Sequence, residues 1–177
     1  MSAQPQETGT FTGAREFFDA ARAAKPDQKR AEELLEQIES EQPHGSGLGA
    51  HVRSSPRADA MAAIVARRMD RAERLRLRIE ADSAIIDAAG IILWGAGWDG
   101  FAGVASILGD EYADVMDHYY LGHHTWTEVG YLVHWSPSLC RRMRDKALRI
   151  VDDFGIDKIL EGTGIVPPEW QHFRRKR

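Results

Sequence analysis

A short cationic segment, residues 136–149, holds the side chains with the clearest chemical use. Four arginines and one lysine lie there within about four helical turns, against the single acid Asp145, although the whole chain has a formal net charge of −4. Phosphate backbones are sensed through local cationic density, so this pattern predicts a local contact with double-stranded DNA. Arginine suits the task because its planar fork can grip guanine or a phosphate with two parallel hydrogen bonds. The cationic residues are Arg141, Arg142, Arg144, Lys146 and Arg149.

Other reactive residue types favour neither a metal centre nor catalysis. Four histidines lie close together in the sequence: His118, His123, His124 and His134. No carboxylate or thiol stands near them at a metal-ligand spacing, so we interpret them as polar loop residues. Cys140 is the single cysteine, which excludes an intrachain disulfide and a cysteine-based zinc finger. With no Ser-His-Asp arrangement or phosphate loop either, we predict no catalytic residue, no metal and no cofactor, and a protein that is not an enzyme.

Capping residues and the spacing of apolar residues predict the helices that position the cationic segment. A helix that stops at Gly122 is followed by Thr125, which can cap a second helix and complete a capping box with Glu128. That helix ends near residue 134, and Trp135 is expected to fill the turn as an apolar plug. Ser136 followed by a proline then starts a third helix. Two short helices joined by a tight turn predict a helix-turn-helix.

Apolar positions define the inward faces of these two helices. On the first, the expected buried residues are Trp126, Val129, Leu132 and Val133. On the second, which Gly155 ends, they are Cys140, Met143, Ala147, Leu148 and Val151. The outward face of the second helix would then offer Ser138, Leu139 and Arg142 to base edges near its start. Its other cationic side chains would lie closer to phosphates: Arg141, Arg144, Lys146 and Arg149.

Residues 125–148 have the order TWTEVGYLVHWSPSLCRRMRDKAL, which resembles the promoter-reading helix-turn-helix in the fourth conserved region of bacterial sigma factors. The longer arrangement, a helical hairpin and a charged helix before this motif, is similar to phage and prophage proteins of the RinA and ArpU type. These are regulators of late phage transcription. The resemblance implies that Ser138, Arg142 and Lys146 face bases, that Arg141 lies near the DNA backbone, and that RNA polymerase is a further partner.

The sequence departs from the sigma-factor pattern at the turn and on the third helix. His134 stands where many members have glycine, and Gly130 where alanine is common. A histidine in the left-handed region is tolerable but strained. Arg144 and Asp145 also differ, so the DNA sequence that sigma factors read is not carried over.

Two long helices are expected before the motif. The first covers about residues 11–42, and Pro26 predicts a kink or short break near Lys25 with Asp27 capping the restart. The second runs from Pro56 to about residue 93. Its apolar residues form a heptad-like seam: Met61, Val65, Ala72, Leu75, Ile79, Ile86, Ala89 and Leu93. The seam indicates an antiparallel helical hairpin that serves as a scaffold or as a homodimer surface.

The sequence therefore predicts an all-α fold in five parts. Residues 1–10 are a disordered N-terminus, 11–93 a coiled-coil-like hairpin, 94–110 a Gly/Trp-rich connector with a short helix, 111–155 the helix-turn-helix domain, and 156–177 a basic tail. The tail is either a disordered terminus or a supplementary phosphate contact.

No secretory signal or membrane-spanning run is visible, so we expect a cytoplasmic protein, associated with the nucleoid of a bacterial host, without a membrane partner. The main hypothesis is a sequence-specific regulator of transcription. The alternatives are a DNA-packaging protein such as a small terminase subunit, and an adaptor that binds RNA polymerase. The oligomeric state would separate a regulator, as monomer or dimer, from a ring-shaped packaging protein.

Overall fold

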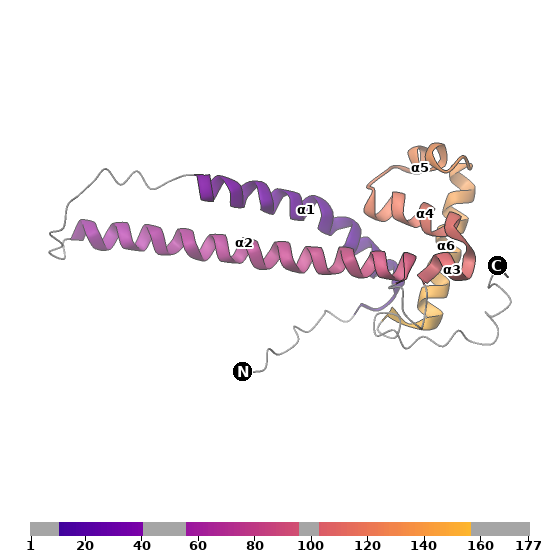
Figure 1. Cartoon of the computed structure of the whole chain (residues 1–177), viewed down its shortest axis with the longest axis horizontal. Helices are drawn as coiled ribbons and strands as arrows, with labels where there is room; N and C mark the ends of the chain where they lie inside the picture. The colour runs from indigo at the N-terminus through magenta and orange to yellow at the C-terminus, as the bar shows by residue number, and fades with distance from the viewer. Residues whose placement is uncertain (1–10, 41–55, 96–102, 157–177) are drawn as a thin grey trace. The chain divides into compact units, whose positions relative to one another are not determined.

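The computed structural model describes residues 11–40, 56–95 and 103–156, and every regular element among them is helical, as expected for an all-α fold. Figure 1 shows their order, which is α1 (Ala14–Ser40), α2 (Pro56–Trp94), α3 (Gly103–Leu108), α4 (Asp110–Met116), the π-helix η1 (Asp117–Leu121), α5 (Trp126–Leu132) and α6 (Pro137–Phe154). The predictions for residues 1–10 and for most of the basic tail lie outside the described residues. No helix in the described part of the chain is long and apolar enough to cross a membrane.

The chain divides into two compact units. One contains Met1–Ala24 and Ile85–Arg177, and we call it the core unit; the other contains Lys25–Ala84, and we call it the paired-helix unit. The two ends of the expected hairpin, the start of α1 and the end of α2, thus belong to the same unit as α3 to α6. The candidate DNA-contacting residues all lie in the core unit.

Aromatic side chains form the centre of the core unit. Phe18 on α1 is fully buried, and its ring lies 5.2 Å from the ring of Tyr120 and 5.4 Å from that of Phe17. Ile92 and Leu93 from the end of α2 are buried in the same cluster. Rings of this size remove a large apolar area from water, so this cluster fixes the ends of the long helices against the later, shorter ones.

The π-helix η1 was not expected from the sequence. The amide of Gly122 donates to the carbonyl of Asp117, five residues earlier, at 2.8 Å, and Gly122 ends the segment as predicted. Two neighbouring rings of η1, those of Tyr119 and Tyr120, lie edge to face with their centroids 4.9 Å apart. Tyr120 enters the core, whereas Tyr119 stacks on Trp126 at 3.8 Å. Burial raises the pKa of Tyr120 to about 12, and its hydroxyl has no hydrogen-bond partner among the described residues.

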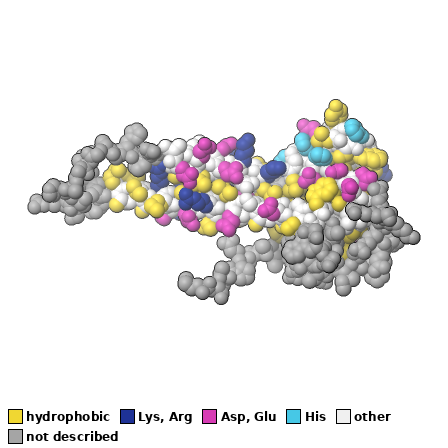
Figure 2. Space-filling model, viewed as in Figure 1, with side chains coloured by type: hydrophobic (Ala, Val, Ile, Leu, Met, Phe, Trp, Pro, Cys, Tyr) yellow, Lys and Arg dark blue, Asp and Glu magenta, His cyan; other side chains and the backbone are white. Residues whose placement is uncertain are grey.

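Polar pairs join the two helices of the paired-helix unit. Asp27 pairs with Arg78 at 2.8 Å, and Glu39 pairs with Arg76 at 2.9 Å. Arg68 also donates to the carbonyl of Ile38. The partners run in opposite order along α1 and α2, as in an antiparallel pair. Figure 2 shows acidic and basic side chains interleaved over these helices, with hydrophobic side chains among them.

Of the kink or short break predicted near Lys25, the break does not occur, and the predicted cap at Asp27 is wrong. Helix α1 continues from Ala14 to Ser40 with Pro26 inside it, and Asp27 pairs with Arg78 instead of capping a new helix. A proline removes one backbone donor and crowds the preceding turn, which a long helix can absorb without ending. Ala24 and Ala31, on either side of the proline, are both buried, so packing holds the helix together there.

The predicted seam on the second helix has two different halves. Ala72, Ala89 and Leu93 are buried as expected, whereas Met61 and Val65 are exposed. Helix α1 ends at Ser40, and the carbonyl of Ile38 near that end accepts a hydrogen bond from Arg68, which lies further along α2 than Met61 and Val65. The apolar side chains left exposed near the start of α2 are Met61, Ile64, Val65 and Met69.

Candidate nucleic-acid interface

Helix α5 begins with the predicted capping box. The amide of Thr125 donates to the carboxylate of Glu128 at 2.7 Å, and the amide of Glu128 donates to the hydroxyl of Thr125 at 3.4 Å. The hydrogen bond from the Thr125 backbone is the main reason that the pKa of Glu128 is lowered. Glu128 is therefore engaged in helix initiation, which leaves no reason to assign it a role as a general base.

The turn between α5 and α6 is closed by backbone contacts. His134 adopts the left-handed conformation expected of it, with φ 58°. The amide of Trp135 donates to the carbonyl of Gly130 at 2.9 Å. A Cβ atom at position 130 would lie only 2.6 Å from the carbonyl oxygen of Trp135. The glycine that departs from the sigma-factor pattern thus lets the chain fold back tightly, and the turn has no room for alanine.

Two side chains expected to be buried near this turn are exposed, and both predictions are wrong. Trp135 is 46% exposed and Leu132 is 42% exposed. The backbone amide of Trp135 is bonded to α5, but the residue does not fill the turn as an apolar plug. Val129 fills the space beneath α5 instead, in a small cluster with Cys140 and Met143.

Helix α6 has the predicted caps and the predicted inward face. The hydroxyl of Ser136 accepts a hydrogen bond from the amide of Leu139 at 3.2 Å, Pro137 occupies the first turn, and Gly155 is the C-cap. Every residue predicted to face inward is buried: Cys140, Met143, Ala147, Leu148 and Val151. The outward face of α6 is therefore determined, because it lies opposite these residues.

The outward face near the start of α6 is cationic. Ser136, Ser138, Arg141 and Arg142 are exposed there, and no acidic residue occurs in the first turn. The guanidinium group of Arg141 lies 5.8 Å from the ring of Trp126 on α5. The exposed residues further along α6 include two acids, Asp152 and Asp153. The net positive charge of the exposed face is thus concentrated in the first half of the helix.

The other candidate residues lie at the edges of this face. Leu139 is partly buried against the small cluster beneath α5, and Lys146 lies over the ring of Tyr112 at 5.3 Å. The side chain of Arg144 is only 15% exposed and lies 4.9 Å from the ring of Trp126. Arg149 is exposed and donates to the backbone carbonyl of Asp145 at 3.4 Å. Arg144 is therefore held inside the fold in the structure described here.

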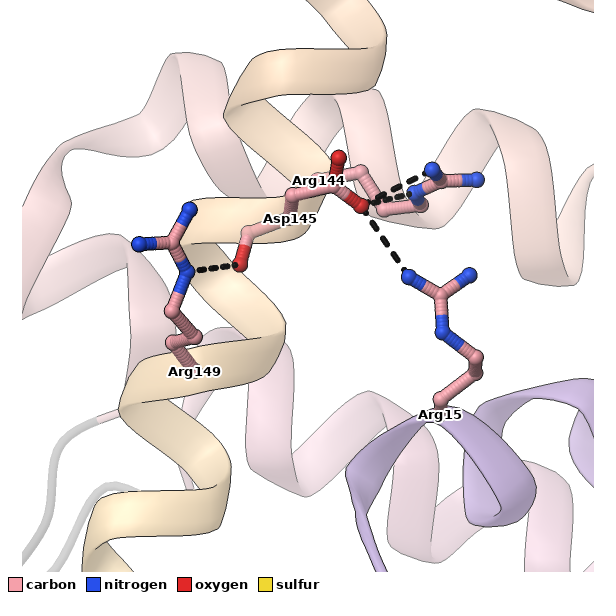
Figure 3. A network of polar contacts seen from close by, with 4 residues as sticks. All are labelled: Arg15, Arg144, Asp145 and Arg149. Carbon is pink, nitrogen blue, oxygen red and sulfur yellow. Dashed lines mark hydrogen bonds and ion pairs between the residues drawn. The ribbon is translucent and has the colours of Figure 1, made fainter.

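One candidate residue was missed because it lies far away in the sequence. Arg15, on the first turn of α1, lies beside α6 with its guanidinium group 3.1 Å from the carboxylate of Asp145 (Figure 3). The same carboxylate accepts two hydrogen bonds from Arg144, at 2.8 and 3.0 Å. Burial alone would raise the pKa of Asp145, but Arg144 and Arg15 together hold that pKa below its usual value.

A second arginine of α1 fixes the loop before α5. Arg22 donates to the carbonyls of His123 and His124 at 3.4 Å and lies 4.2 Å from the ring of Tyr119. No spacing rule in the sequence indicates this contact, because more than a hundred residues separate the partners. Within the described ranges, no cluster of three potential metal ligands is formed, and the loop histidines supply backbone acceptors instead.

Comparison with known proteins adds no assignment. No protein-family model matches the chain, and no curated protein or solved structure is significantly similar to it.

Proposed function

We propose that this chain is a sequence-specific regulator of transcription, of phage or prophage origin, that binds double-stranded DNA and is not an enzyme. In this proposal α5, the turn and α6 act as a helix-turn-helix like that of sigma factors, with α6 in the major groove. The observation that carries the proposal is the pair of exposed arginines, Arg141 and Arg142, about one turn into a helix whose start is capped and free of acids.

Two physical features support this use of α6. The major groove is about 12 Å wide and admits a helix, whose first turns then meet the base edges. The N-terminus of a helix also has a partial positive charge, which favours nearby phosphates. In this proposal Ser138 and Arg142 reach bases and Arg141 reaches the DNA backbone. The acids at positions 152 and 153 would face phosphates unfavourably if the whole helix were in contact.

Selection of binding sites from random duplexes, followed by titration of variants, tests the proposal. Arg142→Ala should relax preference at one base pair and cost about 1–3 kcal/mol on the selected site. Arg141→Ala should weaken binding to selected and random duplexes alike and should flatten the salt dependence by about 0.9 in log–log slope. Arg71→Ala, which removes an exposed arginine from α2, is the matched control and should leave both measurements unchanged.

Equal losses on selected and random duplexes from both α6 variants would contradict the division of roles. Absence of salt-dependent duplex binding by the wild-type chain would contradict the proposal as a whole.

The exposed apolar side chains of α2 support self-association as part of the same proposal. Met61, Ile64, Val65 and Met69 follow a spacing of three and four residues, which places them on one helical face. We propose that this face forms a homodimer, which would present two copies of α6 to two half-sites. Mass measurement in solution should give two copies. A closed ring would favour instead the second candidate function, DNA packaging in the manner of a small terminase subunit.

A third function is favoured by the apolar outer surface of α5. Tyr131 is 81% exposed, and Leu132 and Trp135 are also exposed, which is unusual for three large side chains so close in sequence. A surface of this kind suits a protein partner such as RNA polymerase. An adaptor acting only through this surface would bind polymerase without any salt-dependent affinity for DNA, so the titrations above separate it from the regulator.

A further inference from the structure

The network around Asp145 joins α6 to a residue from the other end of the chain. Figure 3 shows Arg15 approaching from α1 while Arg144 reaches the same carboxylate along α6. A single oxygen, Oδ1 of Asp145, accepts all three of these bonds, at 2.8, 3.0 and 3.1 Å. Arg149 adds a bond to the backbone carbonyl of the same residue. Two guanidinium groups thus bind the carboxylate of Asp145, and a third binds its backbone carbonyl, at the outward face of α6.

The position of Arg15 is set by the fold and does not depend on the ion pair alone. The amide of Ala14 donates to the carboxylate of Asp152 at 2.5 Å, which fastens the start of α1 to α6. Phe17 and Phe18 on the next turn are buried in the core unit. The Arg15 side chain nevertheless remains 57% exposed. It is therefore a solvent-accessible cation held at a fixed place beside the candidate DNA-contacting helix.

A DNA phosphate has the chemistry to take the place of the Asp145 carboxylate. Both groups are anionic and offer two oxygens that guanidinium groups can bind in parallel. Asp145 is 39% exposed, so the ion pair lies at the surface, where such pairs are worth only about 0.2–1 kcal/mol. Exchanging this carboxylate for a phosphate would release counterions from DNA, which favours the exchange at low salt.

We propose that Arg15 belongs to the DNA-contacting surface and that Asp145 occupies, in the free protein, the position that a backbone phosphate takes in the complex. The inference rests on the proposed function and deepens it. Asp145 then has two effects: it orients Arg15 before binding, and its charge opposes binding to any duplex that does not supply further contacts through Arg142. Asp145 is in this sense a residue that sets specificity by weakening random binding.

Titration of selected and random duplexes at several salt concentrations tests this role. Arg15→Ala should weaken binding to both by about five- to tenfold at 0.1 M salt and lower the log–log salt slope by about 0.9. Arg15→Lys retains the charge and should restore the slope, which guards against a simple folding defect. Asp145→Asn should strengthen binding to random duplexes several-fold and steepen the slope. Asp153→Asn, on the same helix but outside the network, should change binding less than twofold.

The outcomes separate the two proposals. If the wild-type chain binds duplexes with the expected salt dependence but Arg15→Ala leaves the slope unchanged, the role of Arg15 is overturned and the proposed function stands. If Asp145→Asn weakens random binding, its carboxylate only supports the fold, and the phosphate-exchange inference is overturned. If the wild-type chain shows no salt-dependent binding, both proposals fail together.

Discussion

The core unit and the paired-helix unit are both helical, yet they bury different kinds of side chain. In the core unit, the ring centroid of Phe18 lies 5.4 Å from that of Phe17 and 5.2 Å from that of Tyr120. Several large aliphatic residues are also fully buried there. In the paired-helix unit the buried hydrophobic residues described are two alanines, Ala31 and Ala72. Its larger apolar side chains are at most partly buried, and two ion pairs whose members are 43–55% exposed join its helices.

The difference indicates which of the two units contributes more to the free energy of folding. Buried aromatic area contributes several kcal/mol per side chain, whereas exposed ion pairs contribute about 0.2–1 kcal/mol each. The core unit therefore holds the larger share of the buried apolar area that stabilises the described residues. The paired-helix unit leaves several large apolar side chains of α2 exposed, and the proposed association with a second copy would cover them.

The largest expected effect is loss of the ring at the centre of the core unit. Phe18→Ala removes a fully buried ring from contact with Phe17 and Tyr120, and should lower the free energy of unfolding by about 3–5 kcal/mol. Hydrogen exchange, read separately over the two units, measures the effect. The control is Leu77→Ala on α2, where the side chain is 49% exposed and the change should stay below about 0.5 kcal/mol. Similar losses from the two variants would contradict the contrast between the units.

A smaller loss is expected at the turn that seats α6. Gly130→Ala places a Cβ atom 2.6 Å from the carbonyl oxygen of Trp135, and backbone must move to relieve the contact. Overpacking of this kind typically costs about 1–3 kcal/mol. Gly90→Ala is a matched control, because nothing lies within 4 Å of a Cβ atom there. Urea denaturation of the two variants should separate them, and equal stability would show that the turn relaxes freely.

Much of the fold could be predicted from the sequence because local chemistry determines it. Thr125, Ser136 and Gly155 cap helices by contacts with neighbours in the sequence, and the caps are found where the residue types place them. The break predicted at Pro26 does not occur, because the packing of α1 on both sides of the proline outweighs the free-energy cost of a proline inside a helix. The π-turn could not be predicted, because it depends on which ring enters a core built from distant segments.

At the candidate site, the sequence predicted the buried face of α6 better than its exposed face. Periodicity identified five buried residues of α6 but missed Ile150 and Phe154, and it correctly indicated that Arg141, Arg142 and Arg149 are exposed. It could not show that Arg144 is held against Asp145 and Trp126, because that depends on side-chain geometry. Nor could it find Arg15, which no local rule connects to α6. Hydrophobicity also gave no sign that Trp135 is exposed, or that its backbone amide closes the turn by bonding to Gly130.

Loss of the cap on α6 should have a moderate effect. Ser136→Ala removes the acceptor for the amide of Leu139 and should cost about 0.5–2 kcal/mol, while Ser136→Asp retains the acceptor and should cost much less. Because the first turn of α6 precedes the exposed arginines, fraying should also lower affinity for the selected duplex. Thermal unfolding and titration measure the two effects. A loss of stability with unchanged affinity would show that the proposed contacts do not need an ordered start of α6.

The smallest expected effect has the opposite sign and lies in the paired-helix unit. Burial raises the pKa of Asp82, while Arg78 lowers it in part and Asp27 raises it. Its Oδ2 atom has no hydrogen-bond partner among the described residues, and Arg78 lies 3.9 Å away. A folded-state pKa above the unfolded one means that the ionised carboxylate opposes folding at neutral pH, and that this penalty disappears as the pH falls through the folded and then the unfolded pKa.

Asp82→Asn removes that penalty and should raise the free energy of unfolding of this unit by up to about 0.5 kcal/mol at pH 7. The gain over wild type should shrink on acidification, because the wild-type carboxyl then becomes neutral in both states. Asp70→Asn, an exposed acid on the same helix, controls for the change in net charge. Hydrogen exchange over α2 at several pH values measures the difference. A loss of stability at pH 7 would mean that the pair with Arg78 outweighs burial, and that polar pairs contribute more to the paired-helix unit than their exposure indicates.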